Sequence, residues 1–364
     1  MELIKGISIS DIHIGNNRVL PEIIHRNLNM YLYPELIEID ILFIVGDFFH
    51  TLLNLNSSSA YYAILIINEI IELSIKHNFL IRVVKGTFEH DRDQNKYFNV
   101  DNKYDHIKVV NTLSIEHIEQ LNINVCYVPD DLPYKNAQAE IVKKIKDHQL
   151  EQVDILLLHS YCKHEIPKDA PIEPNNLFDI DFLEHYVKGP IFKGHIHTKS
   201  IYKTCVNNGS FERLTHGQEE KKGYFKFTYD REKFTYKFIE NKSTAVFSSI
   251  ILGEEDYVNI FIKEVEKIIG KVNDLTPLPI NIRIVCNKEV KNKFNPYDFE
   301  FNVPIRYSTK LIDTKIIQTD TEDMFLVLND LPKLNRGNLN TIISDFIGNK
   351  LSATRVEEIL VAEE

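Results

Sequence analysis

The chain of 364 residues has few of the features that mark secreted or membrane proteins. Its four cysteines form no Cys-x-x-Cys pair, which predicts reduced core thiols rather than disulfides or a zinc site. It has no run of 18 apolar residues, so we expect no transmembrane helix. No basic segment followed by an apolar stretch opens the chain, so we expect no signal peptide. These absences predict a cytoplasmic protein without membrane contact.

Positive charge is also scarce. Lys and Arg number 42 against 53 Asp and Glu, for a net charge of −11. A protein that binds DNA by itself normally carries a basic face. The acidic balance therefore favours either a substrate other than DNA or a partner protein that provides most of the contacts to DNA. With 43% hydrophobic and 26% charged residues, the composition is that of a soluble globular protein of two or three domains.

The most informative pattern is a set of five apolar runs, each of which ends in an acidic residue or a histidine. Short runs rich in Ile and Val predict buried strands. In open α/β sheets, ligands bind beyond the carboxyl ends of the strands, so these side chains can converge on one point. The runs and their polar residues are 7–10 with Asp11 and His13, 41–45 with Asp47 and His50, 80–84 with Glu89, His90 and Asp91, 155–158 with His159, and 191–193 with His195 and His197.

Each of these motifs has an ordinary structural explanation when it is taken alone. Asp-x-His occurs in loops, Gly-Asp after a strand is usually a turn, and a histidine such as His159 is more often a core residue. Five of them at five strand ends favour a metal centre, because oxygen and imidazole ligands together suit Mn²⁺, Fe²⁺ or Zn²⁺. The pattern predicts a two-metal hydrolase for phosphate esters.

The order Asp-x-His, Gly-Asp-x-x-His, His-Asp, His and Gly-His-x-His is similar to that of the calcineurin-like metallophosphoesterases. Within them it resembles the SbcD-type DNA repair exonucleases, the nuclease half of a complex with an SMC-like ATPase. Residues 208–213 and 217–224 resemble the segment that these nucleases carry just after Gly-His-x-His. The resemblance covers about residues 1–240, and beyond them it is only architectural.

The resemblance implies two divalent metal ions, Mn²⁺ first, with Mg²⁺, Fe²⁺ and Zn²⁺ as alternatives. Asp47 would bridge both ions. The other implied ligands are Asp11, His13 and His197 for one ion, and His159 and His195 for the other.

The resemblance also implies that His90 contacts the phosphate and protonates or stabilises the leaving oxygen, while Asp91 orients His90. His50 supports a ligand or is a core histidine. The family's Gly-Asn-His-Asp is two residues longer here, and its asparagine ligand is absent. We expect Glu89 to replace it, with Thr87 or solvent as the alternatives.

The resemblance implies an α/β fold, an αββα metallophosphoesterase sandwich of two sheets flanked by helices, with a nuclease domain at 1–240. Helical spacing predicts helices at 21–39, 57–76 and 137–149. Alternation predicts a hairpin at 224–229 and 234–239, which we expect to close the second sheet.

After a polar linker at 241–250, we expect a helix at 257–269 and strands at 279–286, 303–308 and 312–317. Residues 241–330 thus resemble the small α/β capping domain of these nucleases, with any other small α/β domain as the alternative. Residues 331–364 are expected to form a C-terminal helical segment with a helical stretch at 338–360. The resemblance implies that this stretch binds the ATPase partner, and the alternative is that it docks on its own domain.

The sequence therefore predicts a Mn²⁺-dependent DNA exonuclease or endonuclease subunit of a double-strand-break repair and recombination complex, with DNA and an SbcC-like SMC-family ATPase as partners and homodimer formation left open. The strong use of Ile, Asn and Lys suggests an AT-rich genome, such as that of a phage, in which case the protein would work in the host cytoplasm. The alternatives are a phosphoesterase for small phosphate esters or cyclic nucleotides, and a DNA-binding scaffold with an impaired second metal site.

Overall fold

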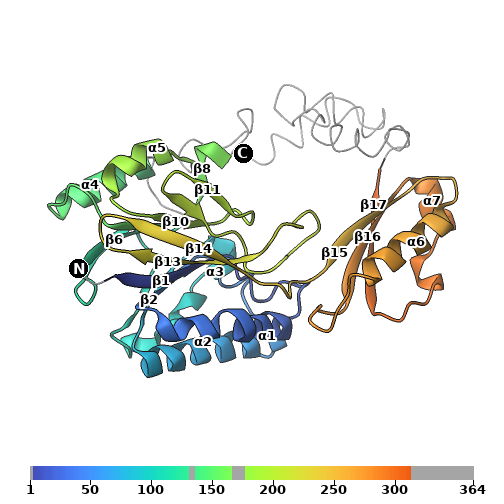
Figure 1. Cartoon of the computed structure of the whole chain (residues 1–364), viewed down its shortest axis with the longest axis horizontal. Helices are drawn as coiled ribbons and strands as arrows, with labels where there is room; N and C mark the ends of the chain where they lie inside the picture. Colours follow the sequence, from blue (N-terminus) through green and yellow to red (C-terminus); the bar gives the residue numbers. More distant parts are fainter. Residues whose placement is uncertain (1–2, 131–135, 166–176, 313–364) are drawn as a thin grey trace, which may run out of the picture. The chain divides into compact units, whose positions relative to one another are not determined.

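The computed structural model describes residues 3–130, 136–165 and 177–312, and its largest feature is a pair of six-stranded mixed sheets (Figure 1). The first sheet has the order β14 (Phe234–Glu240), β13 (Gly223–Tyr229), β1 (Ile4–Ile9), β2 (Ile41–Val45), β3 (Leu80–Val84) and β4 (Ile107–Val110). The second has the order β11 (Ser200–Tyr202), β12 (Cys205–Asn207), β10 (Ile191–Gly194), β7 (Ile155–His159), β6 (Ile123–Val128) and β5 (Ser114–Ile118).

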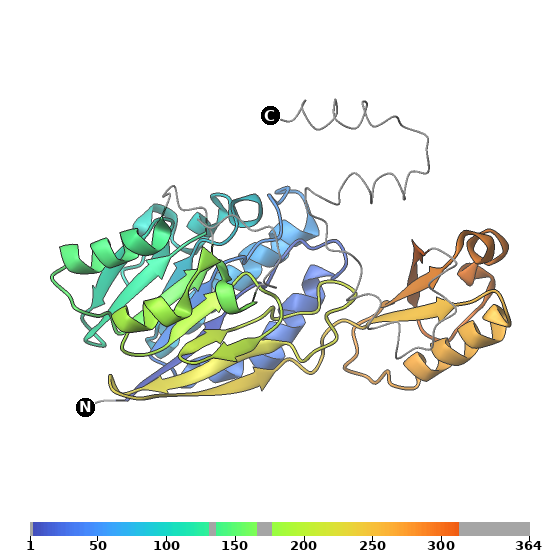
Figure 2. The ribbon, with the colours of Figure 1, turned by 90° about the horizontal axis from the view of Figure 1, so that it is seen from above.

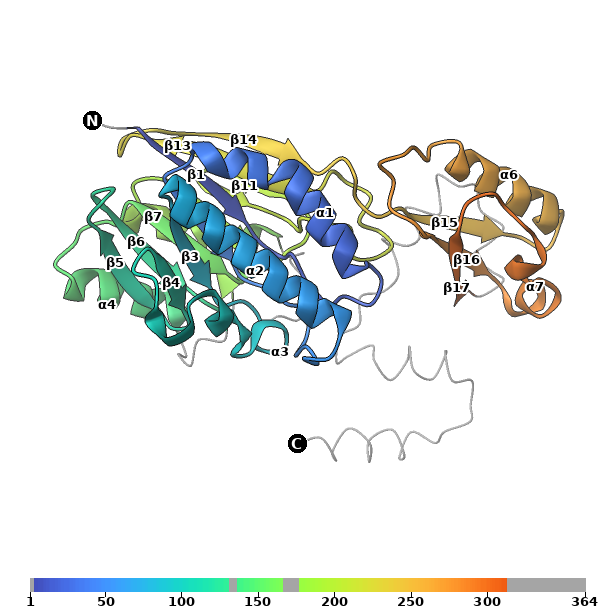
Figure 3. The same ribbon diagram turned by 90° about the horizontal axis from the view of Figure 1, so that it is seen from below.

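Three apolar clusters show how the two sheets are layered. One packs α1 (Pro21–Tyr31) and α2 (Ser58–His77) against the outer face of the first sheet, as Figure 3 shows. A second cluster contains side chains from both sheets, including Phe43 and Phe192, and so fills the space between them. The third packs α4 (Ala137–Asp147) and α5 (Ile180–Leu183) against the second sheet. The predicted α/β architecture of two sheets flanked by helices is confirmed.

The hairpin of β13 and β14 forms as predicted, but it belongs to the first sheet and not to the second. β13 pairs antiparallel with β1, with Ile4 opposite Tyr229, and Figure 2 shows the hairpin beside β1. The reason is that β13 contributes aromatic side chains to the apolar clusters on both sides of the first sheet. Phe225 and Phe227 enter the core between the sheets, while Tyr224 enters the core under α1. Such a strand is best buried between two layers, beside an inner strand.

The helices predicted at 21–39 and 57–76 differ in how well they match the structure. The stretch at 21–39 is not one helix, since α1 ends at Tyr31 and a 3-10 helix follows at Tyr33–Glu38. Pro34 lacks the amide hydrogen that a continuing α-helix requires. The helix predicted at 57–76 is confirmed by α2. It begins after Ser57, and the hydroxyl of Ser57 accepts a hydrogen bond from the amide of Ala60.

By length and composition alone, α2 would be apolar enough to cross a membrane. Its buried residues, among them Ile66, Ile67 and Ile70, belong to the core of the first sheet, as in a core helix of a globular domain.

The predicted linker at 241–250 is instead a buried and hydrogen-bonded segment that runs into a strand. Asn241, Ser243 and Ala245 are at most 3% exposed, and β15 (Phe247–Leu252) begins two residues after Ala245. The Glu212 carboxylate explains the polar sequence, because it accepts hydrogen bonds from the amide of Ala245 at 2.7 Å and from Asn241 at 3.4 Å. Burial raises the pKa of Glu212 to about 7.

A three-stranded parallel sheet follows, with the order β15, β16 (Ile280–Cys286) and β17 (Ile305–Leu311). One face packs on α6 (Tyr257–Ile269) and α7 (Lys288–Lys293) through an apolar cluster of its own. The predicted helix and two of the three predicted strands are present. Nearly all of the strand predicted at 312–317, and the whole helical stretch at 338–360, lie outside the described residues. The domain boundaries at 240 and 330 stay predictions.

The remaining short elements are α3 (Phe88–Asp91), the paired strands β8 (Tyr161–Cys162) and β9 (Leu177–Phe178), and 3-10 helices at Gln94–Phe98, Val100–Asn102, Lys163–Glu165, Glu184–Tyr186 and Pro296–Asp298.

Candidate metal centre

The five strands predicted from the sequence all form, and the polar residues that follow or end them meet at the carboxyl ends of the two sheets. β1, β2 and β3 are parallel neighbours in the first sheet, and β7 and β10 are parallel neighbours in the second. Among the described residues, three groups of side chains there have ligand atoms within 4.8 Å of one another and could each hold a metal ion, and two of them contain a carboxylate. The first group is Asp11, His13 and His197, and the second is Asp47, His159 and His195.

The backbone at this edge is unusual, because several of these residues adopt a left-handed conformation. The φ angles of Asp11, His13 and Asp47 are 50°, 53° and 51°. Such values are uncommon outside glycine and carry a conformational cost. Backbone hydrogen bonds join the loops that follow β1 and β2. The amide of Asp11 donates to the carbonyl oxygen of Gly46, and the amide of His13 donates to that of Asp47, both at 3.1 Å.

Gly46 is required where β2 ends. Its φ is 79°, and a Cβ atom there would lie 2.1 Å from Nδ1 of His159. Any side chain at this position would therefore displace a residue of the second group.

In the first group Asp11 and His13 are at most 1% exposed, while the side chain of His197 is 28% exposed. Nε2 of His13 lies 3.0 Å from Nε2 of His197 and 3.9 Å from Oδ1 of Asp11. Burial lowers the pKa of His13 and, together with the charge of Lys222, lowers that of His197 to about 4. Both imidazoles are thus held neutral, and only a neutral imidazole offers a lone pair to a metal.

Asp11 also ties the two sheets together at this group. Its two carboxylate oxygens both accept from the amide of His195, each at 3.1 Å, and its Oδ2 accepts from Ser10. Burial raises the pKa of Asp11 to about 7.

The second group contains the observation that best tests whether a cation fits. Nδ1 of His159 lies 2.8 Å from the carbonyl oxygen of Val45, so it carries the proton and donates it. This leaves Nε2 of His159 as a buried atom without a hydrogen-bond partner among the described residues, 3.3 Å from Oδ2 of Asp47. A buried lone pair facing a carboxylate calls for positive charge between them.

The pKa values of this group agree with that requirement. Burial opposes the charged form of His159, yet the Asp47 carboxylate prevails and raises the pKa of His159 to about 10. Without a cation, a proton on Nε2 therefore supplies this positive charge, and a metal ion would have to replace that proton. Burial lowers the pKa of His195 to about 3, so its imidazole is neutral. The donor set of carboxylates and imidazoles fits a divalent cation in each group.

Asp47 lies between the two groups. Its Oδ2 is 3.7 Å from Nε2 of His13 in the first group and 3.3 Å from Nε2 of His159 in the second. Its Oδ1 accepts from the amide of Thr87 at 2.6 Å, which holds the carboxylate in this orientation. This is the placement that a bridging carboxylate needs.

The geometry favours Thr87 over Glu89 at the position where the family has asparagine. The Thr87 hydroxyl lies 3.3 Å from both Oδ2 of Asp47 and Nδ1 of His195. Glu89 is in the first turn of α3 with an exposed side chain, and it belongs to neither group. Glu89 as a ligand stays a prediction that no contact of the described residues supports.

We therefore expect Thr87→Val to weaken the second cation, because the hydroxyl beside Asp47 and His195 is lost. Glu89→Gln should leave both cations in place, because its side chain points to solvent. Metal content of the two purified variants, measured by elemental analysis after dialysis, checks this. Loss of one equivalent in Glu89→Gln with none in Thr87→Val would restore Glu89 as the ligand.

His90 lies beside the first group, but a backbone carbonyl orients it instead of Asp91. Nδ1 of His90 is hydrogen-bonded to the carbonyl oxygen of His50, and the His90 and His50 rings are stacked 5.1 Å apart. The Asp91 carboxylate accepts instead from the amides of Asp47 and Gly86 at 3.1 and 2.7 Å. Asp91 thus fixes the loops after β2 and β3, because a fully buried carboxylate needs several donors.

His50 contacts the first group through His13. The Nδ1 atoms of the two rings are 3.2 Å apart, so His50 can accept the proton of His13 and leave Nε2 of His13 free for a cation. Sequence reasoning left His50 open between a supporting and a core role. The half-buried side chain in contact with a group member favours the supporting role.

The sequence reasoning assigned no role to Gln218, which holds the ring of His197. Nε2 of Gln218 lies 2.9 Å from Nδ1 of His197, and Oε1 of Gln218 accepts from the amide of Leu214 at 3.0 Å. Lys222, which is 2% exposed, donates to the carbonyl oxygen of His197 at 2.9 Å. Both residues lie in the stretch 217–224, whose likeness to the family was the only available signal.

Gln218→Ala should change the affinity of the first group for a cation by about 10–100-fold, because the Gln218 side-chain amide donates to Nδ1 of His197 and so determines which ring nitrogen carries the proton. The second group should keep its affinity, because His197, which Gln218 contacts, belongs to the first group and not to the second. Calorimetric titration with Mn²⁺ resolves the two affinities. Equal weakening of both would mean that Gln218 acts on the fold rather than on one ligand.

Comparisons with known proteins add little. No family model and no curated protein matches the chain. Among solved structures, one of an uncharacterised protein is 14% identical and covers 65% of this chain and 100% of that one, with a TM-score of 0.39. Another, GAP50, the anchor in the inner membrane complex of Plasmodium, is 11% identical over 66% of this chain and 85% of that one, with a TM-score of 0.36. Neither likeness bears on the function.

Proposed function

We propose that the protein is a two-metal-dependent phosphodiester hydrolase of the metallophosphoesterase type, with DNA as its substrate. The observation that carries the proposal is the buried Nε2 of His159, which faces Asp47 and has no hydrogen-bond partner among the described residues, within two adjoining groups of carboxylates and imidazoles. A structural zinc site would be closed and rich in cysteine, whereas none of the ligand atoms here is a thiol.

Cations held by these groups would neutralise charge on the phosphate and activate water. The chain's own residues supply the rest. Asp47 fixes the spacing of the groups, and the backbone carbonyls of Val45 and His50 set the ring orientation of His159 and His90. With Nδ1 of His90 bonded to His50, Nε2 is the atom that can carry a proton to a leaving oxygen.

The choice of DNA rests on the resemblance of residues 208–224 to the SbcD-type nucleases. Within that stretch, Glu212 fixes the segment before β15, and Gln218 and Lys222 support His197. An SbcC-like ATPase, bound through residues 331–364, remains part of the proposal, and that segment lies outside the described residues. Repair of double-strand breaks in the cytoplasm, or in the host cytoplasm for a phage protein, follows from the same resemblance.

The test is hydrolysis of end-labelled double-stranded DNA and of a chromogenic phosphodiester, each with Mn²⁺ or Mg²⁺ and with EDTA as the control. We expect metal-dependent cleavage of both, abolished in His159→Ala. Cleavage of a phosphomonoester or a cyclic nucleotide without DNA cleavage would replace the DNA proposal with the small-ester alternative. DNA binding without any cleavage would favour a scaffold.

A further inference from the structure

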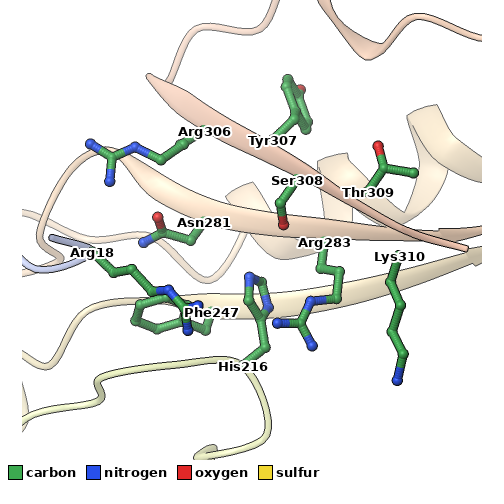
Figure 4. Close-up of a pocket in the computed structure, with 10 residues that line it drawn as sticks. All are labelled: Arg18, His216, Phe247, Asn281, Arg283, Arg306, Tyr307, Ser308, Thr309 and Lys310. Carbon is green, nitrogen blue, oxygen red and sulfur yellow. The ribbon is translucent and has the colours of Figure 1, made fainter. Parts of the chain in front are cut away.

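A concave pocket of about 490 Å³ lies apart from the metal groups, and its lining is strongly basic. Four cations line it, one from the loop before α1 and three from β16 and β17. The lining residues are Arg18, His216, Phe247, Asn281, Arg283 and residues 306–310, which include Arg306 and Lys310. Figure 4 shows Arg18, His216 and Arg283 converging on one space, with Arg306 and Lys310 at its two ends. Within the described ranges, no Asp or Glu lines this pocket.

The basic lining follows from alternation along the small sheet. In the parallel register, Asn281 lies opposite Arg306, and Arg283 lies opposite Ser308. These residues share one face of the sheet, while Ile282 and Ile284 point to the other face and pack on α6 and α7. A sheet covered by helices on one side thus presents a polar, cationic face on the other.

The charges in this pocket repel one another. Burial and the neighbouring Arg18 lower the pKa of Arg283, and burial with Arg283 and Arg18 lowers the pKa of His216 to about 4. Nδ1 of His216 is buried and has no hydrogen-bond partner in the described part of the chain. In a chain with a net charge of −11, gathering four cations without a carboxylate is costly unless an anion joins them.

The hydrogen bonds of these cations leave most of their donors free. Arg18 donates to Thr215, and Arg306 donates to the carbonyl oxygen of Asn17 at 3.4 Å. A guanidinium has five donors and matches phosphate in a forked geometry, so both side chains retain donors for a ligand. The volume falls in the range of small-ligand sites and suits one nucleotide better than a length of duplex.

We propose that this basic pocket, formed by Arg18, Arg283, Arg306, Lys310 and His216, binds the phosphate of a nucleotide, as a site separate from the metal groups. The ligand is a nucleoside 5′-phosphate, either free or at the end of a DNA strand. The site goes beyond the proposed hydrolase activity, because it needs neither metal nor catalysis.

The experiment measures binding to the full chain in EDTA, so that the metal groups contribute nothing. The probes are inorganic phosphate, deoxyadenosine 5′-phosphate and a short 5′-phosphorylated single strand. We expect at least one nucleotide probe to bind, and Arg283→Gln and Arg306→Gln each to weaken it about tenfold, because each removes a charged donor pair. Lys263→Gln, which removes an exposed charge from α6, is the matched control and should change nothing.

Each outcome decides the proposal. Equal affinity for the free nucleotide and the strand assigns the site to free nucleotides, and binding of the strand alone assigns it to a strand end. Absence of binding by all three probes, or binding that survives both arginine substitutions, overturns the proposal. Should Arg283→Gln lower the melting temperature, Arg306→Gln and Lys310→Gln, both at exposed positions, still give the answer. Hydrolysis assays with Mn²⁺ fail or succeed independently, so the two proposals are separable.

Discussion

Asp47→Ala is expected to remove both cations at once. Its Oδ2 lies 3.7 Å from Nε2 of His13 in the first group and 3.3 Å from Nε2 of His159 in the second, so its negative charge acts on both groups. Without it the two imidazole sets lose their shared negative charge. We expect metal content to fall from two equivalents to near zero, and hydrolysis to fall by more than the roughly 10–100-fold that a lost supporting contact costs.

Two matched variants make this result specific. Asp11→Ala should empty chiefly the first group, because Asp11 belongs only to that group. Asp47→Asn keeps an oxygen for the amide of Thr87, so it preserves the loop while it removes the charge. Elemental analysis of the three proteins, with melting temperatures as the check on folding, decides the matter. Equal metal loss in Asp11→Ala and Asp47→Ala would remove the bridging role.

Most residues of this metal centre could be predicted, because the carboxyl ends of buried strands can be recognised in a sequence. The Ile and Val runs before Asp11, Asp47 and His159 are long enough to be buried strands, and the parallel arrangement brings their carboxyl ends to one edge. Which polar residue follows each strand then fixes the set of candidate ligands. The left-handed backbone at these residues gave no signal, since it depends on the packing of one loop against another.

The errors share a physical cause. The stretch at 241–250 looked like a linker because it is polar, but its amides and side chains satisfy the buried carboxylate of Glu212, which lies 29 residues before Asn241. Glu89 directly precedes His90, but within one turn of a helix neighbouring side chains point in different directions, so its ligand role stays a prediction. The spacing of residues in a sequence does not show which residues far apart in the chain form hydrogen bonds. It also does not show in which direction a side chain within an inserted segment points.

His90→Gln is expected to retain both cations and lose cleavage. His90 is a member of neither the Asp11 group nor the Asp47 group, although its ring centroid is only 4.8 Å from that of His13. Loss of a general acid costs about 10²–10⁴ in rate, and glutamine cannot transfer a proton at neutral pH. The measurement is kcat for a dinucleotide, whose alkoxide leaving oxygen needs a proton, under saturating Mn²⁺, with His148→Gln, an exposed histidine at the end of α4, as the control.

The nature of the leaving group separates proton transfer from a mere effect of position. A substrate whose leaving oxygen needs no proton, such as a nitrophenolate, should lose less rate in His90→Gln than one that leaves as an alkoxide, because only the second depends on the acid. His90 also belongs to a further cluster with His13 and His50 whose ring nitrogens could hold an ion. Calorimetric titration with Mn²⁺ tests that alternative directly. A missing equivalent of metal in His90→Gln, together with equal losses on both substrates, would make His90 a ligand and end its assignment as the proton donor.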